Sequence, residues 1–87
     1  MINQNPVLTH EEVQFAHNLR AVREHLGLSR PKFAALLDMP PTTLKNYELK
    51  YRGVSAVLIF KLNACEQTRH FVPELLQCKP IELKVAA

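Results

Sequence analysis

The chain has 87 residues, of which 47% are hydrophobic and 22% charged, and its net charge of +3 gives a pI near 9.1. This length allows one domain, and a domain this small buries only about two-thirds of its unfolded surface, so a partner subunit would add to its stability. The longest uncharged apolar stretch, residues 54–60, is much shorter than the about 20 residues of a membrane-spanning helix, which excludes a membrane protein of that kind.

The chain also starts without the basic residues and apolar core of a signal peptide, so we expect a cytoplasmic protein. The modest positive charge favours an anionic partner but does not choose between nucleic acid and a membrane surface. The cations concentrate between residues 29 and 52, which directs attention to that segment.

The first predicted helix follows a polar lead, residues 1–8. Thr9 and Glu12 have the spacing of a capping box, which marks a helix start, and Gly27 suits the helix end. Between them, apolar side chains recur at the helical period and predict a buried stripe: Phe15, Leu19, Val22 and Leu26.

A second, short helix is predicted to begin after Ser29, whose hydroxyl can accept a backbone N–H. Its end is set by Asp38, which tolerates the left-handed conformation, and by Pro40 and Pro41, which cannot continue the hydrogen-bond ladder. Pro41 suits the first position of a third helix. The segment therefore predicts two short helices joined by a short, stiff turn.

The third predicted helix, residues 41–49, has two sides of different character. Leu44 and Tyr47, three residues apart, predict the side that faces the core. Polar side chains fall on the opposite side and on the flanks: Thr42, Thr43, Lys45 and Asn46.

Two further helices are predicted after residue 53. One is capped by Ser55, runs to about Cys65 and is apolar nearly all round, so it is either central or covered on one side by a second subunit. The other is short and begins near Pro73. Residues 9–78 would form one helical domain.

The tail, residues 79–87, changes to a period of two, because Ile81, Leu83 and Val85 alternate with charged residues. Such alternation is typical of a half-buried strand. A single strand is not stable alone and a helical chain offers it no partner. We therefore expect the tail to pair with the same tail of a second copy, with these three residues at the dimer interface.

The residue types of catalysis and metal binding form no recognisable pattern. Cys65, His70 and Cys78 lack the close ligand pairs of a zinc site, and with no signal peptide a disulfide between the cysteines is not favoured. Glycine occurs only at positions 27 and 53, which excludes a glycine-rich phosphate loop. We expect no enzyme activity, no metal and no cofactor.

Two short helices joined by a tight turn, with polar side chains on the second, are typical of a helix-turn-helix, whose second helix enters the major groove of DNA. The run LRAVREHLGLSRPKFAALLDMPPTTLKNYE, residues 19–48, resembles the lambda-repressor-like or Xre family of bacterial and phage DNA-binding domains. The matching residues are Leu19, Arg20, Arg23, Gly27, Leu28, Ser29, Phe33, Ala34, Leu36, Leu37, Leu44, Tyr47 and Glu48.

The resemblance covers about residues 13–62 and implies an all-α, five-helix lambda-repressor-like domain. Three positions depart from the family pattern. Arg30 replaces the common glutamine that opens the second helix, Asp38 stands where the turn often has glycine, and Pro40 replaces the usual serine cap of the recognition helix. Arg30 would keep a phosphate contact, whereas Pro40 would lose one capping or phosphate hydrogen bond.

By this resemblance the base-reading residues are Thr42, Thr43, Lys45 and Asn46. An asparagine pairs bidentately with adenine, and a threonine methyl contacts the thymine methyl. Contacts to the phosphates would come from Arg30, Lys32, Lys50, Arg52 and the helix start at Ser55. The alternative without a functional role is that these residues form an ordinary solvent-exposed surface.

The function that the resemblance implies is a homodimeric, sequence-specific regulator of transcription that binds double-stranded DNA, for example a repressor of its own operon. The alternative is an antitoxin or other interaction module, in which the part from about Glu66 onward binds a toxin or another partner protein. That part, TRHFVPELLQCKPIELKV, is more than a minimal DNA-binding unit needs.

Overall fold

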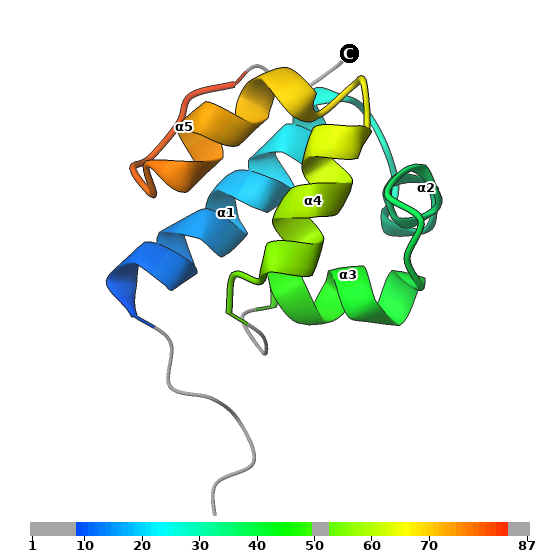
Figure 1. The fold of residues 1–87 in the computed structure, drawn as a ribbon, viewed down its shortest axis with the longest axis horizontal. Coiled ribbons are helices and arrows are strands. Elements are labelled where there is room, and N and C mark those ends of the chain that lie inside the picture. The colour runs from blue at the N-terminus through cyan, green and yellow to red at the C-terminus, as the bar shows by residue number, and fades with distance from the viewer. Residues whose placement is uncertain (1–8, 50–52, 84–87) are drawn as a thin grey trace, which may run out of the picture.

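The computed structural model describes residues 9–49 and 53–83, which form an all-α arrangement (Figure 1). Its elements are α1 (His10–His25), α2 (Arg30–Leu36), α3 (Pro41–Glu48), α4 (Ala56–Ala64), a 3₁₀ turn η1 (Arg69–Phe71) and α5 (Val72–Leu76). The five-helix prediction is confirmed. None of the helices in the described part is long and apolar enough to cross a membrane.

Both ends of α1 are fixed as the sequence predicts. The N–H of Glu12 donates to Thr9 Oγ1 at 3.1 Å and the N–H of Thr9 donates to Glu12 Oε1 at 3.1 Å, which completes the capping box. At the other end Gly27 has φ 70°, and the N–H of Leu28 donates to Arg23 O at 3.2 Å. This is a Schellman ending, in which a left-handed glycine lets the chain turn sharply into α2.

The turn between α2 and α3 is also built from local contacts. Ser29 Oγ accepts the N–H of Lys32 at the start of α2, and Asp38 adopts φ 56° at its end. Pro40 occupies the N-cap of α3 without a side-chain hydrogen bond, as predicted. Lys61 of α4 braces the turn, because its Nζ donates to Asp38 O at 2.7 Å.

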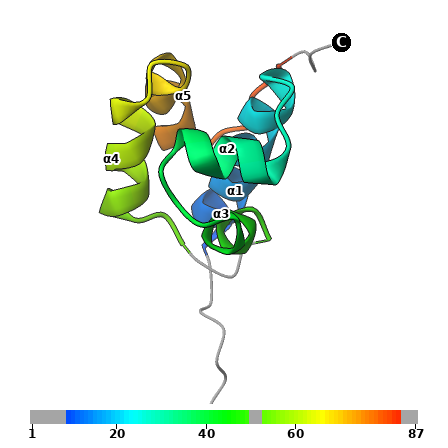
Figure 2. The same cartoon turned by 90° about the vertical axis from the view of Figure 1, so that its right-hand side faces the viewer.

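α1 lies across the middle of the molecule, with α5 along one side of it and α2 and α3 toward the other end (Figures 1 and 2). Its buried stripe shares one core with side chains from the other helices. The largest members of this core with less than 2% exposure are Phe33, Leu19, Leu37, Leu44, Leu58, Leu62, Leu75 and Val22. Phe71 and Val72 are buried in the same core, so the C-terminal part of the chain belongs to the domain.

The described part of the tail forms no strand. Ile81 and Leu83 are partly buried against the core of their own chain, and the side-chain amide of Asn18 in α1 donates to Lys79 O at 2.7 Å. Alternating apolar residues also suit a segment that packs on helices, which is what residues 79–83 do in the single chain. The pairing of this tail with the tail of a second copy stays a prediction. Val85 lies outside the described residues.

α4 is not the central helix. Only Leu58 and Leu62 are buried in it, whereas Val57 is 61% and Phe60 is 72% exposed. Figure 2 shows α4 at one edge of the molecule, with the other helices all to one side of it. The described part of the chain therefore leaves the outer side of α4 uncovered.

Candidate nucleic-acid interface

α3 keeps one side in the core and turns the other outward. Leu44 has no exposed surface and Tyr47 is buried. Of the residues predicted to read bases, Thr42 and Lys45 are exposed, and Thr43 and Asn46 are half-buried. The four side chains therefore remain accessible in part or in full on one short helix, which runs along an edge of the molecule (Figure 1).

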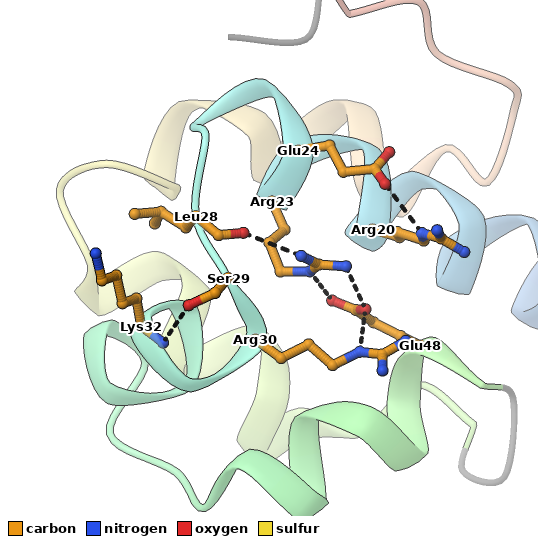
Figure 3. A network of polar contacts seen from close by, with 8 residues as sticks. All are labelled: Arg20, Arg23, Glu24, Leu28, Ser29, Arg30, Lys32 and Glu48. Atoms are coloured by element: carbon orange, nitrogen blue, oxygen red, sulfur yellow. Dashed lines mark hydrogen bonds and ion pairs between the residues drawn. The ribbon is translucent and has the colours of Figure 1, made fainter. Parts of the chain in front are cut away.

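The last residue of α3 is held by two arginines (Figure 3). The side chain of Glu48 has no exposed surface, and its Oε2 accepts from Arg23 Nε at 2.8 Å. Its Oε1 accepts from Arg23 Nη2 at 3.2 Å and from Arg30 Nε at 3.0 Å. Arg23 Nη1 also donates to Leu28 O at 3.0 Å. We call Arg23, Arg30 and Glu48 the arginine–glutamate cluster; it joins α1, the first residue of α2 and the end of α3.

This cluster carries one positive charge more than it needs for neutrality, because two guanidinium groups meet one carboxylate. The Arg23 side chain is 12% exposed and the Arg30 side chain is 31% exposed, so the excess charge is nearer to solvent at Arg30. The bond from Nε uses one of the five donors of a guanidinium group. Arg30 is thus fixed in place while it remains partly exposed.

Sequence reasoning identified Arg23 and Glu48 only as residues that match the family, and missed their contact. One signal was present: Leu44, Tyr47 and Glu48 have the i, i+3, i+4 spacing of a single helix face, which places a carboxylate on the buried side. A buried carboxylate requires a partner. The spacing does not say which of the chain's cations supplies it.

Ser55 connects α3 with the start of α4. Its Oγ accepts the N–H of Leu58 at 3.1 Å, which caps α4 as predicted, and lies 2.8 Å from Tyr47 Oη. The hydroxyl therefore already has two protein partners. A phosphate contact at this place, which stays a prediction, would use the backbone N–H groups of the helix start.

Removal of the Ser55 hydroxyl should lower stability without affecting charge. We expect Ser55→Ala to reduce the free energy of unfolding by about 0.5–2 kcal/mol, the usual cost of a lost N-cap. Urea denaturation followed by circular dichroism would measure it. Ser55→Thr keeps the hydroxyl and is the matched control; if both variants lost the same stability, the cap would not be the cause.

Not all predicted phosphate contacts can be placed. Lys32 is exposed on the first turn of α2. Lys50 and Arg52 lie outside the described residues. The structure therefore brings Arg30 and Lys32 to the start of α2, and Ser55 to the side of α3 that faces α4.

The cysteines and histidines do not assemble into a site. Within residues 9–49 and 53–83, no three of the His, Cys, Asp and Glu side chains are grouped so that they could hold a metal ion. Cys65 and Cys78 are both free thiols. Burial, together with the charges of Glu11 and Glu12, raises the pKa of the Cys78 thiol above its usual value.

Comparison with known proteins agrees with this geometry. A family model described as helix-turn-helix matches residues 19–64, which is more than half of the chain. The match begins within α1 and ends at the last residue of α4, so it includes α2, the turn and α3. Neither the curated proteins nor the solved structures gave a significant match. The chain belongs to the helix-turn-helix family of DNA-binding regulators, and to its Xre or lambda-repressor-like type.

Proposed function

We propose that this protein is a homodimeric repressor that recognises a near-palindromic DNA operator by placing α3 in the major groove. The observation that supports this most strongly is the fixing of α3 on its inner side, by Leu44, by the arginine–glutamate cluster and by the Tyr47–Ser55 contact. A rigid helix can present polar side chains to base edges in one orientation. Each of the two subunits of the dimer would bind one half-site of the operator.

The outward side chains have the chemistry that base reading requires. The carboxamide of Asn46 can accept from and donate to adenine at once, and Lys45 can donate to guanine or to a phosphate. The methyl groups of Thr42 and Thr43 can contact the methyl group of thymine. In this proposal Arg30, Lys32, Lys50 and Arg52 bind phosphates and set the position of α3 along the groove.

Lys32 offers a direct test of a phosphate contact. Lys32→Gln removes one charge from each subunit, so the logarithm of the binding constant should depend less steeply on the logarithm of salt concentration, by about one unit for each subunit. The loss of affinity should be similar on specific and random duplexes. Fluorescence anisotropy titrations at several salt concentrations would measure the slope, and an unchanged slope would remove Lys32 from the interface.

The proposed function is tested by binding to the DNA upstream of the protein's own gene. We would titrate labelled upstream duplex and a scrambled duplex of equal length, each at two salt concentrations. A specific regulator should prefer the first by at least about 4 kcal/mol, with strong salt dependence on both. Weak and equal binding to the two duplexes would contradict autoregulation at that site.

The second candidate is an antitoxin-like protein that binds a partner through its C-terminal part. The observation in its favour is Leu76, a large apolar side chain of α5 that is 53% exposed. The tail residues Ile81, Leu83 and Val85 stay candidates for a contact between copies. A neighbouring gene for a small toxin, and co-purification of its product with this protein, would favour the second candidate.

A further inference from the structure

The outer side of α4 is the most exposed apolar surface among the described residues. Phe60 is 72% and Val57 is 61% exposed, and the two are three residues apart, so they lie on the same side of the helix. A phenyl ring left in water forgoes a large part of the hydrophobic stabilisation that burial would give it. We call the side of α4 that carries Val57 and Phe60 the α4 face.

An open hollow lies directly beside Phe60. It has a volume of about 160 Å³ and lies between the end of α2 and the second half of α4, where Leu36, Leu37 and Ala64 line it together with Phe60 itself. A benzene ring fits a cavity of about 150 Å³. The hollow is therefore the size of one phenyl group, and the phenyl group on its rim, that of Phe60, is 72% exposed.

We infer that the α4 face is the contact between two copies of this chain, in which Phe60 of each copy enters the hollow of the other. This deepens, and rests on, the homodimer of the proposed function. A two-fold contact needs a surface that is complementary to itself, so that residue i meets residue j and residue j meets residue i. A projecting ring next to a ring-sized hollow meets that condition within one surface.

The charges on this face also suit a second copy. Asp38 and Lys61 line the hollow as one acid and one base, and Lys61 Nζ lies 3.9 Å from Asp38 Oδ2. The charged residues that line the hollow therefore sum to zero, although the chain as a whole carries a net charge of +3. Two such faces meet without repulsion, whereas DNA gains nothing from a neutral apolar surface.

The contact leaves α3 accessible. α4 starts next to α3 and leads away from it (Figure 1), and α3 lies with the other helices on the side of α4 away from its outward side (Figure 2). A two-fold axis along α4 would place both copies of α3 at the same end of the dimer. That is the arrangement with which a dimer reads two half-sites on one side of DNA.

The test is sedimentation equilibrium of the full chain and three variants, in the absence of DNA. Phe60→Glu and Val57→Glu place a charge in the contact, and Phe60→Glu should raise the dimer dissociation constant by at least about thirtyfold, as for a hot-spot residue. Leu76→Glu changes an apolar residue on α5 that is 53% exposed, and is the matched control. Thermal unfolding followed by circular dichroism verifies that each variant folds.

The inference is supported if the wild type and Leu76→Glu are dimers at concentrations where the two α4 variants are monomers. A monomeric wild type, a Phe60→Glu dimer of unchanged strength, or a Leu76→Glu variant as monomeric as Phe60→Glu would each overturn it. Anisotropy with a random duplex separates this from the proposed function. A monomeric wild type that binds DNA would overturn the contact and the homodimer but not the DNA binding, and a dimer that does not bind DNA would overturn only the DNA-binding part of the proposed function. A Phe60→Glu dimer of unchanged strength would overturn the contact alone.

Discussion

Glu48→Gln should lower the free energy of unfolding by about 3–5 kcal/mol, because it removes one partner of a buried ion pair and leaves the other partners charged. Arg23 and Arg30 would face an amide in place of a carboxylate, and Arg23 is only 12% exposed, so water cannot replace the lost charge there. Urea denaturation of the wild type and the variant, analysed as a two-state transition, would give the difference.

A matched control for Glu48 is present in α1. Glu24 accepts from Arg20 Nε at 3.1 Å, but both side chains are largely exposed, at 55% for Arg20 and 40% for Glu24. Helix pairs of this spacing contribute about 0.3–0.5 kcal/mol, so Glu24→Gln should change stability very little. Equal losses in the two variants would mean that burial of the arginine–glutamate cluster has no special energetic role.

Asn46→Ala should weaken binding to the specific operator by about 1–3 kcal/mol and leave binding to random DNA nearly unchanged. The physical reason is that a bidentate amide–adenine pair forms only with the right base, whereas random DNA is bound through phosphates. The measurement is anisotropy with the preferred duplex, with a duplex changed at one base pair, and with a scrambled duplex. The variant should also discriminate less well against the changed base pair.

The control for Asn46 is Gln77→Ala, which removes an exposed carboxamide side chain at the C-cap of α5. It should bind both duplexes as the wild type does. If Asn46→Ala lost equal affinity on specific and random DNA, Asn46 would act on the phosphates or on the stability of α3. Unfolding measurements on the variant would distinguish the last two cases.

The local parts of this fold could be predicted from the sequence because their causes are local. The capping box at Thr9, the left-handed residues Gly27 and Asp38, and the paired prolines each act within about four residues along the chain. Together they set the ends of the helices and the length of the turn. The family resemblance then identified the arrangement as a helix-turn-helix.

The contacts between distant residues could not be predicted in this way. Arg23 and Glu48 are 25 positions apart, and no periodicity relates them. The apolar circumference of α4 is equally consistent with a central helix and an exposed one, so only the packing shows that Phe60 points outward. In the tail, alternation did not reveal that Ile81 and Leu83 pack in part against the core of their own chain, and their pairing with a second copy stays a prediction.

The bond between Asn18 and the tail has a consequence for how the protein is made. Asn18 is 2% exposed, and its amide finds a partner in Lys79 O, 61 positions later. A buried amide without that partner is costly. A nascent chain therefore cannot form this bond until residues 79–83 have left the ribosome. Prematurely terminated products would lack this closing contact, so they would unfold more readily and be degraded before they could compete for DNA.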